Sequence, residues 1–134
     1  MKILNSYNIT GTMPWPILNS PVYYGINASD NIGADAHGLI IQSSSQISLT
    51  GIYVSSNDGY GAYIDDSSDV SLGYFTALGN TLGGLYVSDS ENISVNRASI
   101  TGNLADGVYM VNTSGAVIYS GYIAQNSDDG IHAS

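Results

Sequence analysis

Cysteine is absent from this chain of 134 residues, so the sequence offers no disulfide and no thiolate metal site. Basic residues are scarce: Lys2 and Arg97 stand against eleven acidic residues, which gives a formal net charge of −9. A surface with that charge repels nucleic acid and anionic membranes. No run of about 20 apolar residues occurs, which argues against a membrane-spanning helix.

A secretion signal is also missing at the start, because polar residues arrive by Asn5 and interrupt any apolar run. We expect an extracellular protein, at a cell surface or on a virion. Its signal would have been removed or left out of this chain, or it would be released on lysis, as phage structural proteins are. Only 10% of residues are charged and 16 are glycine, a composition suited to strands and turns rather than helices.

The main feature of the chain is a gapless repeat of 23 residues. Copies start at Gly38, Gly61, Gly84 and Gly107, and a fifth begins at Gly130. Repeats of this length indicate a solenoid. With the glycine as repeat position 1, positions 2 and 4 are apolar in every copy. Position 3 lies between them and holds Ile40, Tyr63, Tyr86, Tyr109 and His132. Alternation of this kind predicts a strand with one buried face.

Positions 10 and 12, and more loosely 15 and 17, repeat the alternation, so each copy carries three short strands joined by turn residues. Stacking the coils about 4.8 Å apart pairs each strand with its copies. The sequence therefore predicts an all-β, parallel solenoid with one continuous core.

Two further repeat positions are invariant. The opening glycines indicate either a positive φ or tight packing at the turn. Position 20 is asparagine in all four full copies, which is explained by solvent-facing turn residues or, as we expect, by a hydrogen-bonded ladder. These asparagines are Asn57, Asn80, Asn103 and Asn126.

The rhythm Gly-aliphatic-Tyr-aliphatic, polar bend, Ile-Ser-Val and Asn bend resembles the repeats of right-handed parallel β-helix proteins, the pectin-lyase-like superfamily. The resemblance covers residues 38–134. It implies a right-handed parallel β-helix with three short strands per coil. It implies no single function, because this fold carries lyases, hydrolases, phage tailspikes, adhesins and surface-layer proteins.

Residues 1–37 depart from the repeat. They contain the only tryptophan, Trp15, and all three prolines, at positions 14, 16 and 21. We expect an irregular N-terminal cap that covers the open end of the core, because exposed strand edges recruit other strands. An irregular first coil would follow, with Asn31 in place of the ladder asparagine and three extra residues before His37. Residues 38–134 form the β-helix repeats.

Catalytic candidates come from a second resemblance. The segments Leu104-Ala105-Asp106-Gly107 and Asp128-Asp129-Gly130 look like the N-T-D-G and D-D segments of polygalacturonases. This resemblance implies Asp106, Asp128 and Asp129 as the carboxylates of an inverting glycosidase. Leu104-Ala105 replaces Asn-Thr, however, and the downstream His and Arg-x-Lys segments of that family have no counterpart. Aspartate before glycine is also ordinary turn chemistry. We therefore expect no catalytic residues and keep the enzyme as an alternative.

No metal or cofactor is expected. An acidic edge at the bend after the first strand is either a calcium site or, as we expect, a solvated surface. It consists of Asp65, Asp66, Asp69, Asp89 and Glu91. His37 and His132 have no second histidine or carboxylate at metal-ligand spacing, and we expect a loop residue and an outward-facing strand residue. Four N-x-Ser/Thr sequons are possible glycosylation sites. They begin at Asn8, Asn27, Asn92 and Asn112.

Tyr63, Tyr86 and Tyr109 are predicted to form a row on the outside of the first sheet. Such a row binds glycans or a neighbouring subunit, or stabilises its own sheet, and both interpretations stay open. Nothing after Ser134 covers the last coil, so either the natural protein continues or another copy docks there. Our hypothesis is a non-enzymatic structural subunit of an extracellular fibre that assembles head to tail. The alternatives are a polysaccharide-degrading enzyme, or a fragment of one, and a glycan-binding tailspike or adhesin segment.

Overall fold

The computed structural model describes residues 1–4, 7–11 and 25–134, and side chains for residues 1–2 and 25–134. Every regular element in these ranges is a β-strand. None of the described residues forms a helix long and apolar enough to cross a membrane. Trp15 and the three prolines of the predicted cap lie outside the described residues.

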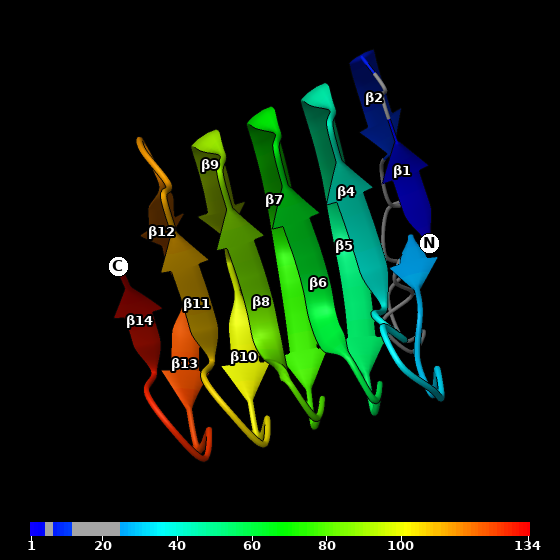
Figure 1. The fold of residues 1–134 in the computed structure, drawn as a ribbon, viewed down its shortest axis with the longest axis vertical. Coiled ribbons are helices and arrows are strands. Elements are labelled where there is room, and N and C mark those ends of the chain that lie inside the picture. Colours follow the sequence, from blue (N-terminus) through cyan, green and yellow to red (C-terminus); the bar gives the residue numbers. More distant parts are fainter. Residues whose placement is uncertain (5–6, 12–24) are drawn as a thin grey trace, which may run out of the picture.

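The chain winds into coils stacked along one axis, and their strands pair in parallel (Figure 1). The first sheet has the order β1-β4-β6-β8-β11-β14, and the second, bent sheet contains the remaining strands. The strands are β1 (Lys2–Leu4), β2 (Tyr7–Gly11), β3 (Ile26–Asn27), β4 (Leu39–Gln42), β5 (Ser45–Ser55), β6 (Tyr60–Asp65), β7 (Ser68–Leu78), β8 (Gly83–Ser88), β9 (Glu91–Asn96), β10 (Ser99–Thr101), β11 (Val108–Val111), β12 (Val117–Tyr119), β13 (Tyr122–Ala124) and β14 (Ile131–Ala133).

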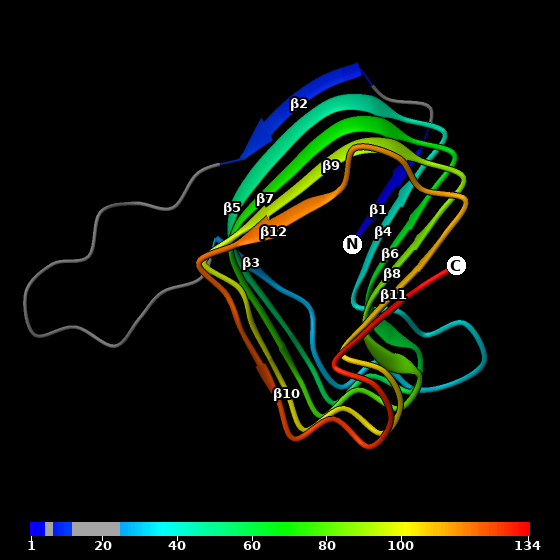
Figure 2. The same cartoon turned by 90° about the vertical axis from the view of Figure 1, so that its left-hand side faces the viewer.

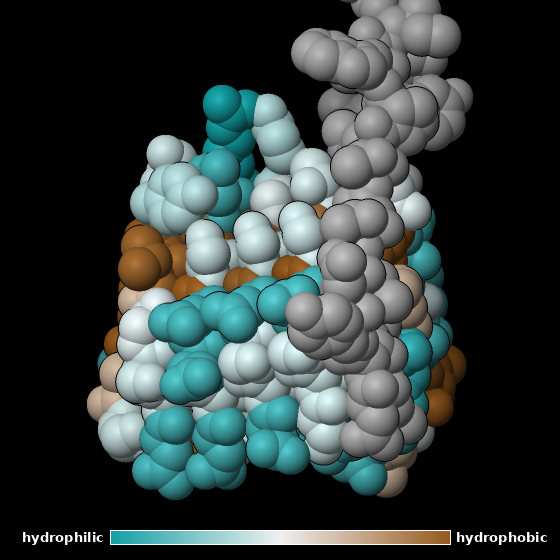
Figure 3. All heavy atoms as spheres, turned by 90° about the horizontal axis from the view of Figure 1, so that it is seen from above, coloured by the Kyte–Doolittle hydropathy of each residue, from teal (hydrophilic) through white to brown (hydrophobic). Residues whose placement is uncertain are grey.

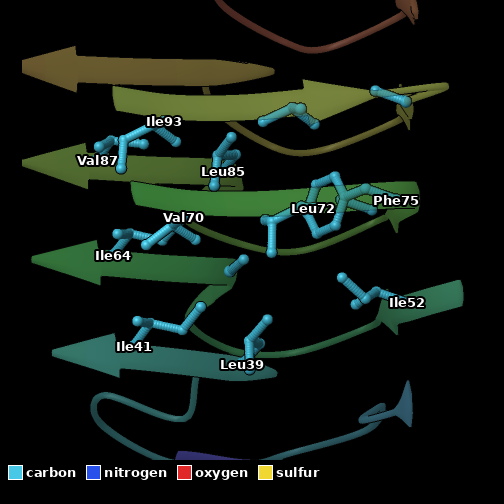
Figure 4. Close-up of a cluster of buried hydrophobic side chains, with 14 of the residues drawn as sticks. Leu39, Ile41, Ile52, Ile64, Val70, Leu72, Phe75, Leu85, Val87 and Ile93 are labelled. Atoms are coloured by element: carbon cyan, nitrogen blue, oxygen red, sulfur yellow. The ribbon is translucent and has the colours of Figure 1, made fainter. Parts of the chain in front are cut away.

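The register follows the 23-residue period. Ile41 pairs with Ile64, Ile64 with Val87, and Val87 with Met110. Seen along the axis, the coils enclose one interior (Figure 2). Apolar side chains from both sheets line up inside it in rows (Figure 4), and Phe75 is the largest of those fully buried. The predicted parallel solenoid with a linear core is confirmed.

The bend between the second and third predicted strands interrupts the strand in fewer coils than the sequence indicated. In two coils they form one continuous strand, β5 and β7, across a residue of positive φ, Gly51 at 75° and Tyr74 at 49°. In the next two coils the equivalent residues, Arg97 and Ser120, separate β9 from β10 and β12 from β13. In β5 and β7 a single left-handed residue thus turns the chain without interrupting the strand.

The N-terminal segment contributes more than a cap. β1 pairs with β4, and both β2 and β3 pair with β5, so these strands form a coil of their own in front of Gly38. The offset is 38 residues at Lys2↔Ile40 but 26 at Ile26↔Ile52. Most of the extra residues therefore lie between β2 and β3, and three more lie between Asn31 and His37, as expected, which is why the 23-residue period is not visible there.

The position-20 asparagines form a ladder that is buried at Asn57, Asn80 and Asn103 and partly exposed at Asn126. The Nδ2 of each donates to the Oδ1 of the next, at 2.8 Å from Asn57 to Asn80, 3.0 Å from Asn80 to Asn103 and 2.8 Å from Asn103 to Asn126. Asn31 extends the ladder by donating to Asn57 at 2.6 Å. Each Oδ1 also accepts the backbone N–H of the asparagine before it. The ladder thus satisfies polar groups that the turn would otherwise bury unpaired.

The opening glycines are explained by tight packing and not by positive φ, because none of those at positions 38, 61, 84 and 107 has φ in the left-handed region. A Cβ on Gly61 would lie 2.6 Å from the carbonyl oxygen of Gly84 and 2.8 Å from the Asn80 amide. The glycine therefore lets successive coils approach beside the ladder.

A second ladder was missed in the sequence. Ser44, Ser67 and Ser90 occupy repeat position 7 and are buried. The Ser67 hydroxyl accepts the Ser44 N–H at 3.2 Å, and the Ser90 hydroxyl accepts the Ser67 N–H at 3.1 Å. Each hydroxyl donates to the carbonyl two residues earlier. The conserved spacing of these serines within the repeat was the available signal.

Candidate functional site

The predicted tyrosine row lies on the outer face of the first sheet and is longer than expected. Tyr63 packs against Tyr86 with ring centroids 5.0 Å apart and planes 6° apart. Tyr86 lies 5.5 Å from Tyr109, which meets the edge of His132 at 4.8 Å. At the other end His37 stacks on Tyr63 at 4.9 Å and 10°. Both histidines thus belong to the row, although His37 was expected to be a loop residue.

Tyr60 joins this aromatic row from repeat position 23, the position before the opening glycine. Its ring centroid lies 4.9 Å from that of Tyr86. A Cβ at Gly83 would lie 3.2 Å from a ring carbon of Tyr60, so the absence of a side chain there leaves room for the Tyr60 ring to contact Tyr86. We call His37, Tyr60, Tyr63, Tyr86, Tyr109 and His132 the aromatic row.

The ring faces within the aromatic row are largely used by the row itself. Tyr63 has His37 from the coil before it and Tyr86 from the coil after it, both nearly parallel to it. A sugar that binds by stacking needs a free ring face. Tyr63 offers outward only its edge and hydroxyl. The geometry is therefore that of a stack that stabilises its own sheet.

The electrostatic environment of the aromatic row is negative. Burial raises the pKa of Tyr60, and the nearby Tyr86 and Asp106 raise it further. Burial also raises the pKa of Tyr63, with a smaller contribution from the Asp65 carboxylate. At His37 burial lowers the pKa and outweighs the opposite effect of Asp35. The His37 Nδ1 accepts the N–H of Tyr60 at 2.9 Å, which requires that nitrogen to be unprotonated.

Two of the three aspartates of the enzyme alternative come together at one end of the row. A carboxylate oxygen of Asp106 lies within 4.8 Å of one of Asp129, and both lie 3.8 Å from the Nδ1 of His132. The expectation that His132 has no carboxylate at metal-ligand spacing was therefore wrong. Asp129 and His132 are three residues apart, and an ideal strand would place them on opposite faces. The chain bends at Gly130, between them, which brings both to the outer face.

This arrangement does not suit the inverting hydrolysis that the polygalacturonase resemblance implied. Inverting enzymes hold their carboxyl groups about 6.5–9.5 Å apart to admit a water molecule. Asp106 and Asp129 approach more closely than that. The third candidate, Asp128, is exposed and is not part of the cluster.

The acidic edge lies on the bends after the first-sheet strands, where hydrophilic side chains gather in rows (Figure 3). A shallow groove of about 660 Å³ crosses these bends and is lined mostly by serines and acidic residues. Neighbouring coils satisfy most of the carboxylates. Asp66 accepts the Ser43 hydroxyl at 3.0 Å, Asp69 the Asn92 amide at 3.1 Å and Asp89 the Asn112 amide at 3.1 Å. These acids bond to other coils and do not converge on a common point.

A family model for the right-handed β-helix region matches residues 36–134, most of the chain. This protein belongs to the right-handed β-helix family. No curated protein and no solved structure matches it. The resemblance to right-handed parallel β-helix proteins is thereby confirmed, and the pectin-lyase-like superfamily is consistent with it.

The described sequons of this β-helix are exposed. Asn92 and Asn112 lie on the acidic bends and donate to carboxylates of the preceding coil. Asn27 is exposed at the end of β3 and accepts the hydroxyl of Ser29 at 2.8 Å. The side chain of Asn8, in β2, is outside the described residues. Glycosylation at these sites stays a prediction.

Proposed function

We propose that this β-helix is a non-enzymatic structural module, a segment of an extracellular fibre or surface appendage on a cell or virion. One observation supports this most strongly: the repeated polar and aromatic side chains bond to their own copies. The amides of the asparagine ladder, the hydroxyls of the serine ladder and the ring faces of the aromatic row are engaged between coils. A rod built in this way is stiff, and it leaves little of its repeat free for a substrate.

Head-to-tail contact between copies is the second part of the proposal. β12, β13 and β14 pair with the preceding coil only. Ile131, at the repeat position where Leu39 and Val108 are fully buried, is 50% exposed. Ile118 and Ile123 are only partly buried. A chain of residues 1–134 therefore presents open backbone pairing groups and apolar side chains together at this end, and the N-terminal coil of a second copy would cover both. Such a contact does not close on itself and extends into a filament.

Sedimentation velocity and electron microscopy of the purified chain test this assembly. We expect rods whose length grows with protein concentration. Ile131→Lys places a charge in the end contact and is expected to leave dispersed monomers. The matched control, Ser71→Lys, adds the same charge to an exposed lateral position on β7 and is expected to assemble like the parent. Monomers at every concentration of the parent protein would refute the head-to-tail contact.

Substitutions of Tyr86 distinguish the glycan-binding function from the structural one. Its ring contacts three neighbours, Tyr60, Tyr63 and Tyr109. At about 0.5–1.5 kcal/mol for each aromatic pair, Tyr86→Ala is expected to cost about 2–3 kcal/mol of stability. Tyr86→Phe is expected to cost much less because it keeps the ring. Urea unfolding followed by circular dichroism measures both. An unchanged unfolding midpoint in Tyr86→Ala, together with lost retention on a polysaccharide column, would favour the glycan-binding function instead.

A further inference from the structure

Asp106, Asp129 and His132 bring three donor atoms of two kinds to one point on the outer face of the first sheet. Asp106 and Asp129 occupy repeat position 23 in successive coils, just before β11 and β14. His132 is the central residue of β14. The donor atoms all lie within 4.8 Å of one another, and the His132 Nδ1 is 3.8 Å from each carboxylate. Among the residues with described side chains, this is the only such group of three.

The three donors are held in place by backbone pairing. Tyr109 pairs with His132 across β11 and β14, and the Val108 N–H donates to the Gly130 carbonyl at 3.0 Å. The Asp129 N–H donates to Oδ1 of Asp106 at 2.9 Å, which leaves the other oxygen, Oδ2, toward the histidine. The side chain of Asp106 is only 16% exposed. The Tyr109 ring meets the imidazole at 4.8 Å and restricts its orientation. Asp106 and His132 are therefore positioned before an ion binds, whereas the side chain of Asp129 is 66% exposed.

The donor separations fit an ion better than they fit direct bonds. At 3.8 Å the histidine is beyond hydrogen-bond distance of both carboxylates. Ligands about 2.0–2.2 Å from a zinc ion lie on the order of 3–4 Å from one another. Two carboxylates balance the charge of a divalent ion. The imidazole favours zinc and similar transition metals over calcium or magnesium, which prefer oxygen ligands alone.

The carboxylates of the acidic bends differ from those of the Asp106, Asp129 and His132 cluster. There Asp66, Asp69 and Asp89 each accept a hydrogen bond from a side chain of another coil. At the Asp106 cluster the side-chain oxygens Oδ2 of both aspartates face the imidazole nitrogen at a distance that leaves space between them. Convergence on a nitrogen donor distinguishes this cluster from the general acidity of the surface.

We infer that Asp106, Asp129 and His132 bind one divalent transition-metal ion of the zinc type, with water in the remaining coordination positions. The ion ties β14 to the coil before it, because its ligands come from both. β14 is otherwise held by pairing with β11 alone. The site thus acts as a clamp on the outermost described strand, and this inference does not depend on whether copies assemble head to tail.

Isothermal titration of the EDTA-treated full chain with zinc chloride tests the inference. We expect one site per chain with a Kd below about 10 μM. His132→Gln and Asp106→Asn are each expected to weaken binding at least about ten-fold. The matched controls are Asp128→Asn, which removes the charge beside Asp129, and Asp89→Asn on the acidic bends. Both controls are expected to bind zinc as the parent does.

Hydrogen exchange gives an independent readout. Zinc is expected to slow exchange at the Ser134 N–H, which donates to the Met110 carbonyl at 3.0 Å, without altering strands near β4. Circular dichroism checks that each variant keeps the strand content of the parent. The inference is overturned if zinc does not bind below about 100 μM, if Asp128→Asn weakens binding as much as His132→Gln, or if calcium binds equally well and His132→Gln has no effect.

Discussion

At the scale of single residues, buried polar side chains that recur at one repeat position join successive coils by hydrogen bonds. Asn80 is fully buried, and its side chain serves two coils. Its Oδ1 accepts both the N–H and the Nδ2 of Asn57, and its Nδ2 donates to Asn103 and to the Val54 carbonyl. One asparagine therefore satisfies four partners. Because the partners are themselves buried, no water can replace it.

Asn80→Ala is accordingly expected to lower the free energy of unfolding by about 3 kcal/mol or more, since each buried unpaired group costs about 1–3 kcal/mol. Asn96→Ala is the control. Asn96 is a partly exposed residue of β9 and lies outside the ladder, so we expect a change within about 0.5 kcal/mol. Urea unfolding followed by circular dichroism compares the two. Equal losses would mean that the ladder is an incidental consequence of the repeat.

His37 makes stability depend on pH. Burial lowers its pKa below the usual value of 6.5, and its Nδ1 accepts the Tyr60 N–H. The unfolded chain therefore takes up the proton more readily than the folded one. The resulting stability is complete above pH 6.5, the pKa of the unfolded state, and is lost as the pH falls from there through the lower pKa of the folded state.

We expect the unfolding midpoint of the parent to fall between pH 7.5 and about pH 5.5, a range above the usual pKa of carboxylates. The fall is expected to be smaller in His37→Gln, which cannot be protonated. The same fall in His37→Gln as in the parent would show that another group is responsible.

At the scale of the strand and the coil, the close approach of other atoms decides which of the opening positions must be glycine. A Cβ on Gly84 would lie 2.3 Å from a methyl of Ile100 and 2.6 Å from the carbonyl oxygen of Gly107. Gly130 stands at the same repeat position one coil beyond Gly107, yet a Cβ there meets nothing closer than Ile123 at 3.8 Å. The requirement for glycine therefore comes from residues later in the same coil and at the start of the next, and not from the turn.

This pair gives a test within one repeat position. Gly84→Ala is expected to destabilise the protein by about 1–3 kcal/mol or more, because the added methyl overpacks the interior. Gly130→Ala is expected to be neutral within about 0.5 kcal/mol. Thermal and urea unfolding of the two variants measure the difference. If both substitutions cost the same, backbone conformation rather than packing explains the glycines.

The 23-residue period made most of these elements predictable, because a residue that recurs at fixed spacing recurs in one environment. It predicted the strands, the linear core and the place of Asn31. The fused strands β5 and β7 could not be read in this way, since Tyr74 and Arg97 both have positive φ but only one ends the pairing. An irregular first coil was expected, but the part of it that β1 and β2 form was not, because an insertion breaks the spacing.

The candidate sites were less predictable than the fold. The aromatic row was expected, but which way its ring faces point depends on side-chain packing that repetition does not fix. The Asp106, Asp129 and His132 cluster joins two repeat positions that a period of two assigns to opposite faces. It required knowledge of the bend at Gly130. The polygalacturonase pattern thus identified two of these residues for a chemistry that their separation does not suit.

At the scale of the whole molecule, the net charge of each copy opposes the proposed head-to-tail contact between copies. Each copy carries a formal net charge of −9, so copies repel as they approach. The proposed end contact is apolar and includes Ile131, Ile118 and Ile123. Added salt shortens the range of the repulsion, from about 10 Å at 0.1 M to about 3 Å at 1 M, and leaves the apolar contact intact.

We therefore expect sodium chloride to strengthen head-to-tail association. Sedimentation velocity at about 0.05, 0.15 and 0.5 M salt should show progressively longer species at one protein concentration. Parallel samples with EDTA separate this effect from metal bridging between copies, which EDTA would abolish. Association that weakened with salt would point to attraction between opposite charges. Among the described side chains that attraction has only Lys2, Arg97, the histidines and the N-terminal amine to supply the positive partner, so Lys2→Ala and Arg97→Ala would then identify it.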